Sequence, residues 1–123
     1  MHRIFVYGSL LRGQANHGLL ADSRSVGPAE TLPRYTLVDL GEFPGLLAGG
    51  TTAVAGEVYA VSAATLAQLD RLEEHPHVYE RRPIALASGE PVEAYLLHPR
   101  WRRGAPEIRA WHWPERAPAG ARP

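Results

Sequence analysis

The feature that most constrains this chain is an apolar run from Ile4 to Tyr7 that ends at Gly8 and Ser9. Its β-branched and aromatic residues are typical of a buried strand, and the glycine marks a tight turn at the strand end. Glycine lets another group approach the main chain closely, so the amides of Gly8, Ser9 and Leu10 can converge on an anion. The residues alone leave two interpretations open: an anion-binding turn, or a plain connection to the next element.

Length and composition exclude several classes of function. The 123 residues predict a single domain over 1–116 and a flexible tail over 117–123. Basic and acidic residues are equal at 13 each, so no net field favours nucleic acid or an anionic membrane. The sequence has no cysteine and no lysine, which removes thiol catalysis, cysteine-ligated zinc and Schiff-base chemistry. Because no signal peptide and no run of about 20 apolar residues is present, we expect a cytoplasmic protein with a small or neutral partner.

Strand-like segments outnumber helical ones. A helix is expected over 62–74, where Ser62 can cap the first turn and leucines recur at helical spacing, and a short helix is expected within 10–22. Strands are expected over 3–7, 25–32, 34–40, 52–61, 78–86 and 92–97, the last two antiparallel. Gly56 indicates a bulge or a close backbone approach, and 41–50 is expected to be loop and turn with a few extended residues over 45–47. The pattern predicts an α+β domain with a twisted, largely antiparallel sheet or open barrel.

Glu73 is the carboxylate that helical periodicity places against the core. It follows Leu69 by four residues and Leu66 by seven, so it shares their face, whereas Asp70 and Glu74 fall to one side. Desolvation raises the pKa of a carboxyl toward the range in which it can transfer protons near neutral pH, which makes Glu73 a candidate general acid and base. The alternative is a glutamate that extends to solvent or pairs with an arginine at position 71, 81 or 82.

Other residues give weaker indications of chemistry. His75 and His77 lack a third ligand at a suitable spacing, so they indicate a loop or a helix end rather than a metal site. Ser9 lacks the Gly-x-Ser-x-Gly frame of a hydrolase nucleophile, so its expected contribution is its backbone. Tyr79 begins the strand after the helix, and its hydroxyl can reach the cavity that Glu73 faces.

Two features therefore occur in a fixed order: the strand end Tyr7-Gly8-Ser9-Leu10, and the helix end Leu69-Asp70-Arg71-Leu72-Glu73 ahead of Tyr79. Together they resemble the γ-glutamylcyclotransferase-like superfamily. With Phe43-Pro44-Gly45 and Gly56-Glu57-Val58-Tyr59, the chain is similar to the AIG2-like and γ-glutamylamine cyclotransferase branch. The resemblance runs from about residue 3 to residue 97.

This resemblance implies a small mixed, largely antiparallel β-barrel flanked by a few short helices, with a pocket at one end. It implies an enzyme, a cyclising acyltransferase, in which the glutamyl α-amine attacks the γ-carbonyl and releases 5-oxoproline and an amine. No cofactor and no metal is implied. By position, the resemblance implies Glu73 as the catalytic acid and base, and a substrate site made by Tyr7, Gly8, Ser9, Leu10 and Tyr79.

Two other functions remain open from the sequence. One is a non-catalytic module that binds a small carboxylate in the same pocket. The other is a structural or interaction role, with Trp101, Trp111 and Trp113 on a surface that meets a partner. In each case we expect a monomer that binds neither nucleic acid nor a membrane.

Overall fold

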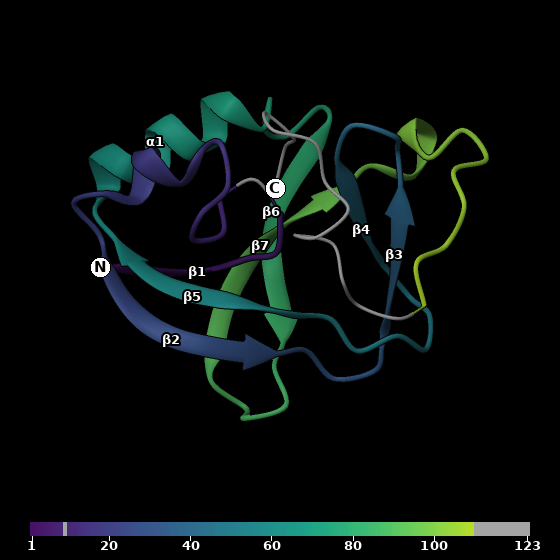
Figure 1. Ribbon diagram of the computed structural model, residues 1–123, viewed down its shortest axis with the longest axis horizontal. Coiled ribbons are helices and arrows are strands. Elements are labelled where there is room, and N and C mark those ends of the chain that lie inside the picture. The colour runs from purple at the N-terminus through teal and green to yellow at the C-terminus, as the bar shows by residue number, and fades with distance from the viewer. Residues whose placement is uncertain (9, 110–123) are drawn as a thin grey trace.

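The computed structural model describes residues 1–8 and 10–109, arranged as Figure 1 shows. The predicted tail over 117–123 and the tryptophans Trp111 and Trp113 lie outside the described residues. The strands are β1 (His2–Val6), β2 (Arg24–Glu30), β3 (Tyr35–Asp39), β4 (Pro44–Ala48), β5 (Ala55–Val61), β6 (Tyr79–Ala85) and β7 (Pro91–Leu97). The helices are α1 (Ala63–Leu72) and the short 3-10 helices η1 (His17–Leu20) and η2 (Pro99–Trp101).

Strand β1 lies at the centre of a five-stranded sheet with the order β2-β5-β1-β7-β6. It pairs antiparallel with β5 and parallel with β7, and the remaining neighbours are antiparallel. Its central place follows from apolar side chains on both faces. Ile4 and Val6 join one buried cluster, and Phe5 and Tyr7 join another. The predicted buried strand is confirmed, and it delivers Gly8 to the interior.

The predicted helix over 62–74 forms as α1, which lies above β1 and β5 in Figure 1. The Ser62 hydroxyl accepts a hydrogen bond from the Thr65 amide at 3.2 Å, which caps the first turn as expected. Leu66 and Leu69 are buried against the sheet side of the helix. The short helix expected within 10–22 is limited to the 3-10 turn η1.

The extended residues expected over 45–47 belong to a longer strand, β4, which runs from Pro44 to Ala48 where loop and turn were predicted on either side. This strand pairs antiparallel with β3, and Val38 faces Gly45 in the register. Gly45 is required there because a Cβ atom at that position would lie 2.6 Å from Cδ2 of Leu97 on β7. Proline and glycine suit this strand because Pro44 is its first residue and Gly45 lets β7 approach. Pro44 and Gly45, which are typical of a turn in sequence, therefore lie in a strand that packs against β7.

The fold class predicted from the sequence is confirmed: a mixed, largely antiparallel α+β domain with few short helices. Among the described residues, continuous ladders form the five-stranded sheet and a separate two-stranded sheet of β3 and β4. Isolated bridges such as Tyr35 to Thr52 pair a strand with a residue outside the strands, and the described ladders do not close one continuous barrel. Within the same residues, we find no helix with the length and apolar character needed to cross a membrane.

Candidate active site

Glu73 occupies the C-cap of α1 and has a fully buried side chain, 0% exposed. Its amide donates a 3.0 Å hydrogen bond to the carbonyl oxygen of Leu69, so the last turn of the helix sets its position. The helical spacing from Leu66 and Leu69 places the glutamate on the buried face, as predicted. The alternative in which Glu73 extends to solvent is wrong.

The neighbouring carboxylates diverge from Glu73 as the periodicity predicts. Glu74 is exposed and adopts a left-handed backbone with φ of 53°, so the helix turns away at this point. Asp70 is partly exposed and binds Arg81, whose Nε and Nη2 atoms lie 3.0 and 3.2 Å from its two oxygens. Arg81 also pairs with Glu93 at 2.8 Å, so its guanidinium is committed to two carboxylates other than Glu73.

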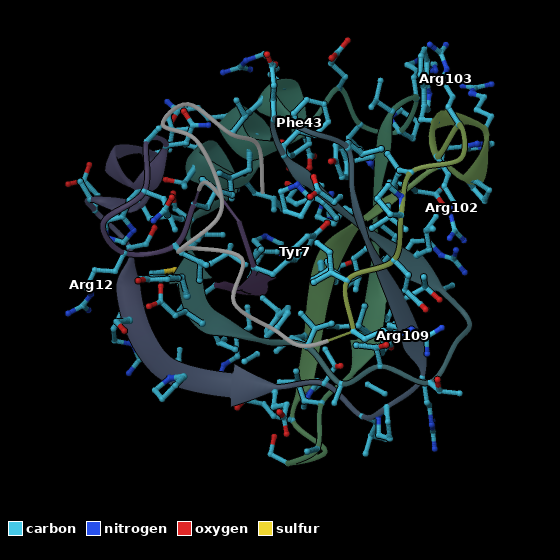
Figure 2. The ribbon with its side chains drawn as sticks, turned by 45° about the vertical axis from the view of Figure 1, so that its right-hand side comes forward. Tyr7, Arg12, Phe43, Arg102, Arg103 and Arg109 are labelled. Carbon is cyan, nitrogen blue, oxygen red and sulfur yellow. The ribbon has the colours of Figure 1, made fainter. Side chains whose placement is uncertain are left out.

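The hydroxyl of Tyr7 is buried and makes two hydrogen bonds to the backbone. It donates to the carbonyl oxygen of Tyr95 at 2.6 Å and accepts from the Leu46 amide at 3.3 Å. Burial raises the pKa of Tyr7 well above its ordinary value of 10.0, and the charges of Tyr79 and Glu73 raise it further. Figure 2 shows Tyr7 near the middle of the molecule.

Tyr79 ties β6 to the β3-β4 hairpin. Its side chain is 0% exposed, and its hydroxyl donates a 2.6 Å hydrogen bond to the carbonyl oxygen of Pro44. Its amide donates to the carbonyl oxygen of Glu73 at 3.2 Å, which connects β6 directly to the end of α1. The prediction that the Tyr79 hydroxyl reaches the cavity that Glu73 faces stays a prediction.

The turn after β1 brings Gly8 and Leu10 to the same end of β1 as Tyr7. Both residues are buried, and the Leu11 amide donates to the carbonyl oxygen of Gly8 at 3.0 Å, which closes the turn. Ser9 lies outside the described residues, so the predicted convergence of the three amides stays a prediction. Further along the turn, the Arg12 amide donates to a carboxylate oxygen of Glu57 on β5 at 2.9 Å.

The two histidines that follow α1 each accept a hydrogen bond from a neighbouring segment. Nδ1 of His75 accepts a hydrogen bond from the Arg81 amide at 3.0 Å. The carbonyl oxygen of His77 accepts from the indole nitrogen of Trp101 at 3.2 Å. Over residues 1–8 and 10–109, we find no group of three or more histidine, aspartate or glutamate side chains arranged to hold a metal ion.

The chain matches a known protein family. The family described as "Gamma-glutamyl cyclotransferase, AIG2-like" matches residues 4–115. The chain belongs to this family. A Vibrio cholerae protein named "Putative gamma-glutamylcyclotransferase" is 49% identical over 88 residues, which cover 72% of this chain and 76% of that protein. The Escherichia coli K12 protein named "Gamma-glutamylcyclotransferase family protein YtfP" is 40% identical over 87 residues, which cover 71% and 75%.

Solved structures of AIG2-like proteins share the fold. The crystal structure of a mouse AIG2-like protein aligns with a TM-score of 0.76 at 30% identity, covering 99% of this chain and 97% of that one. The solution structure of E. coli ytfP aligns with a TM-score of 0.71 at 35% identity, covering 93% and 97%. The resemblance stated from the sequence is thus confirmed at the level of family and fold.

Sequence reasoning missed several residues that position the candidate site of this member of the AIG2-like family. Tyr95 supplies the carbonyl that orients Tyr7, and its own hydroxyl donates to Asp70 at 2.7 Å. Leu46 supplies the amide on the other side of the Tyr7 hydroxyl. The Tyr7 hydroxyl thus joins β1 to β7 and β4, and the Tyr95 hydroxyl joins β7 to α1. No local sequence pattern predicts these contacts. Glu57 could have been identified from the sequence, because a carboxylate in a half-buried strand needs a hydrogen-bonding partner.

Proposed function

We propose that this protein is a γ-glutamyl(amine) cyclotransferase, which converts a γ-glutamyl compound into 5-oxoproline and a free amine. The observation that carries the proposal is the fully buried carboxylate of Glu73, whose backbone carbonyl accepts a hydrogen bond from the amide of Tyr79. Membership of the AIG2-like γ-glutamylcyclotransferase family supports the reaction class. The expected partner is thus a small γ-glutamyl substrate.

In the proposed mechanism Glu73 transfers a proton between the two nitrogens. Its carboxylate takes a proton from the α-ammonium of the bound substrate, and the free amine attacks the γ-carbonyl carbon of the same molecule. A carbon–nitrogen bond forms and closes the five-membered ring, while the carbonyl oxygen becomes an oxyanion. Glu73 gives its proton to the departing nitrogen as the original amide bond breaks and the carbonyl forms again. The ring nitrogen then loses its second proton to the departing amine, which leaves a neutral lactam nitrogen and a protonated amine. Nucleophile and electrophile belong to one molecule, so holding the ring-closing pose supplies much of the rate.

The turn after β1 is the proposed binding element. The backbone amides of Gly8, Ser9 and Leu10 would hold the glutamyl oxygens and the developing oxyanion, since amide donors at a fixed turn need no reorganisation during the reaction. Tyr7 and Tyr79 would form the wall between this turn and Glu73. Each group of the mechanism belongs to the chain or to the substrate, so no cofactor takes part in any step.

The test is release of 5-oxoproline from a panel of γ-glutamyl amines and γ-glutamyl amino acids. Glu73→Gln keeps the shape of the side chain and removes its proton transfer, so we expect turnover to fall by about 10²- to 10⁴-fold. Glu80→Gln is the matched control, because it makes the same change on a half-exposed carboxylate of β6. Circular dichroism of each variant establishes that it folds.

Two outcomes would overturn the proposal. If Glu73→Gln releases 5-oxoproline at the wild-type rate, the assigned acid and base is wrong. If no panel member turns over, but one stabilises wild-type and Glu73→Gln protein equally against heat, the pocket is a binding module for a small carboxylate. The expected monomeric state, cytoplasmic location and lack of nucleic-acid binding remain predictions for gel filtration, fractionation and binding assays.

A further inference from the structure

Arg81 on β6 contacts the chain on both sides of Glu73. Its Nε and Nη2 atoms lie 3.0 and 3.2 Å from the two carboxylate oxygens of Asp70, which precedes Glu73 on α1. Its backbone amide donates a 3.0 Å hydrogen bond to Nδ1 of His75, which follows Glu73. One residue of the sheet therefore holds the end of α1 at two points, with the proposed acid and base between them.

Backbone hydrogen bonds close the segment between these two points. The His75 amide donates to the carbonyl oxygen of Asp70 at 2.9 Å, and the Tyr79 amide donates to that of Glu73 at 3.2 Å. Carbonyl groups at the end of a helix have no partner within the helix, so contacts of this kind decide where its last turn lies. Glu73 is the C-cap residue, and its position therefore depends on β6 as well as on α1.

Four side chains form a cluster at this helix end, called here the Arg81 cluster: Asp70, Arg81, Glu93 and Tyr95. Nη1 of Arg81 donates to Glu93 at 2.8 Å, and the Tyr95 hydroxyl donates to Asp70 at 2.7 Å. The side chains of Arg81 and Asp70 are 21% and 25% exposed, so most of each is shielded from water. The hydrogen bond to Asp70 raises the pKa of Arg81, which keeps the guanidinium charged. Two parallel donors on one carboxylate fix its orientation as well as its distance.

Strand pairing brings the Arg81 cluster together. Arg81 faces Tyr95 in the register of β6 with β7, and Glu93 lies two residues before Tyr95 on the same face of β7. In Figure 1, β6 begins beside the end of α1. The sheet therefore determines where the guanidinium meets the carboxylate of Asp70.

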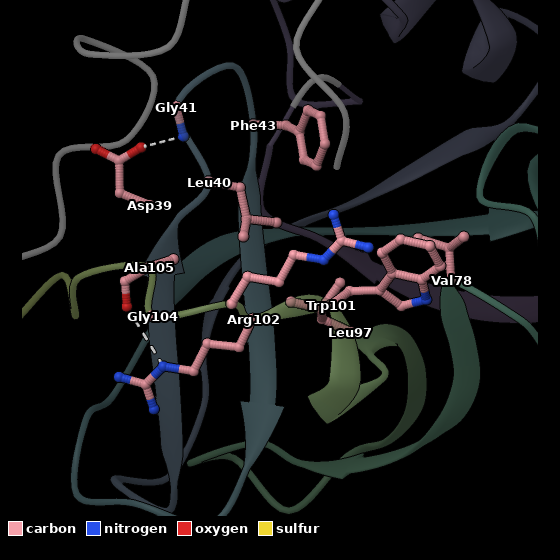
Figure 3. A pocket seen from close by; sticks show the side chains of 11 residues that line it. Asp39, Leu40, Gly41, Phe43, Val78, Leu97, Trp101, Arg102, Gly104 and Ala105 are labelled. Atoms are coloured by element: carbon pink, nitrogen blue, oxygen red, sulfur yellow. Dashed lines mark hydrogen bonds between the residues drawn. The ribbon is translucent and has the colours of Figure 1, made fainter.

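The cavity in Figure 3 is a separate feature of the molecule. It has a volume of about 530 Å³, opens between the turn that joins β3 and β4 and the segment around η2, and includes Val78 and Leu97 in its lining. Among the described residues that line it, no member of the Arg81 cluster occurs. The cluster is therefore a contact between α1 and the sheet and not a wall of that cavity.

We propose that Arg81 is a positioning residue for the reaction assigned to Glu73. Through Asp70 and His75 it holds the end of α1, and so keeps the Glu73 carboxylate at the distance and angle from which it transfers a proton. The inference rests on the proposed function, since it assigns the support of that acid and base. Because substrate binding is assigned to the turn after β1, a loosened helix end should slow ring closure without weakening binding.

Arg81→Lys tests the forked contact, since it keeps the positive charge and removes the two parallel donors. With the panel substrate that turns over fastest, we expect kcat to fall about tenfold and KM to change by less than about twofold. Arg82→Lys is the matched control. Arg82 is the next residue of β6, is exposed and lies 3.7 Å from Glu80, so neither value should change. Circular dichroism establishes that each variant folds.

The same substitution in the Glu73→Gln protein separates positioning from general damage to the enzyme. Residues that act through one another have non-additive effects. Arg81→Lys should therefore lower the residual rate of Glu73→Gln by less than about twofold. A tenfold loss in both backgrounds, or no loss of kcat in either, overturns the inference and leaves the proposed function intact.

Hydrogen exchange of backbone amides tests the positioning without any substrate. We expect the amides of Glu73 and His75 to exchange about tenfold faster in Arg81→Lys than in the wild type, because both lie in the segment that Arg81 holds. The Leu66 amide, which donates to the carbonyl oxygen of Ser62 at 2.9 Å, is the internal control near the start of α1 and should be unchanged. Unchanged exchange at Glu73 and His75, or the same increase at Leu66, overturns the inference.

The remaining outcomes are also decided by these measurements. If no panel member yields 5-oxoproline, the proposed function fails, and hydrogen exchange alone decides whether Arg81 holds the segment around Glu73. If Arg81→Lys does not fold, Tyr95→Phe replaces it, because it removes the hydroxyl that donates to Asp70 and leaves the Tyr95 carbonyl in place. For Tyr95→Phe we expect kcat to fall about threefold, and only where Glu73 is present. An unchanged kcat overturns the inference.

Discussion

The Tyr79 hydroxyl donates a 2.6 Å hydrogen bond to the carbonyl oxygen of Pro44 and so joins β6 to the start of β4. Tyr79 also contacts Glu73 through its backbone amide. A single residue therefore holds the β3-β4 hairpin, the edge strand β6 and the end of α1 at fixed positions. Displacement of any of these elements would change the wall around Glu73.

Tyr79→Phe tests this connection. Loss of a buried donor should lower the free energy of unfolding by about 1 to 3 kcal/mol, measured by chemical denaturation. Because the hairpin then loses its hydrogen bond to Tyr79, one of its attachments to the five-stranded sheet, we also expect 5-oxoproline release to fall roughly tenfold.

Tyr35→Phe is the matched control for Tyr79→Phe. Its hydroxyl accepts a 2.7 Å hydrogen bond from the Ala85 amide, which is likewise a contact between a tyrosine and the backbone. We expect a similar loss of stability with activity retained. Equal loss of activity in both variants would contradict a specific role of the contact between Tyr79 and Pro44.

A second prediction concerns Gly56, where the sequence predicted a bulge or a close approach. A Cβ atom there would collide with the carbonyl oxygen of Val6 and lie 2.7 Å from Cζ of Phe5. Gly56→Ala should therefore lower the free energy of unfolding by about 1 to 3 kcal/mol, because β1 must shift. Gly18→Ala is the control, since no atom lies within 4 Å of the added methyl group. Equal denaturation midpoints for the two variants would show that β1 and β5 adapt freely.

Some of the site could be predicted from the sequence because it depends on local periodicity. The spacing of Glu73 from Leu66 and Leu69 is a property of one helix, so its burial follows from that helix alone. The strand end at Gly8 is equally local. Neither pattern says how the two features lie relative to each other, and their shared role in one site comes from the ordered resemblance to a family and stays a prediction.

The remainder depends on pairing between distant segments. Pro44 and Gly45 are typical of a turn, yet they lie in a strand because β3 pairs with them and β7 approaches their glycine. Tyr95 orients Tyr7 only through the position of β7 beside β1. No window of sequence contains both partners of such a contact. Propensity is outweighed here by tertiary packing, which is the usual reason that local patterns fail.

A third prediction concerns the stability of the fold at acidic pH. Burial alone would raise the pKa of Asp70, but hydrogen bonds from Arg81 and Tyr95 lower it below its ordinary value of 3.8. The folded protein therefore binds this proton less readily than the unfolded chain. The stability from Asp70 is fully present above pH 3.8 and is lost as the pH falls through the lower, folded-state pKa.

Asp70→Asn should remove this contribution. We expect a loss of about 1 to 2 kcal/mol in the free energy of unfolding at neutral pH, discounted for partial exposure, and a smaller loss in acid. Glu80→Gln is the control, because its exposed pair with Arg82 spans 3.7 Å and should contribute less than about 0.5 kcal/mol. A loss from Asp70→Asn that is the same at every pH would assign the effect to packing rather than charge.

The last prediction concerns tyrosine ionisation and the stability of the fold at alkaline pH. Burial raises the pKa of Tyr7 and of Tyr95. The charges of Tyr79 and Glu73 raise the pKa of Tyr7 further, and the hydrogen bond to Asp70 raises the pKa of Tyr95 further. Because the folded-state pKa of each phenol exceeds that of the unfolded chain, their stabilising effect is complete below pH 10.0 and is lost as the pH rises further. Their phenolate absorbance should therefore appear together with loss of the β-sheet circular dichroism signal, and Tyr7→Phe should reduce that cooperative absorbance step. Smooth titration of all five tyrosines near pH 10.0 with the circular dichroism unchanged would mean that Tyr7 and Tyr95 exchange protons with solvent in the folded protein.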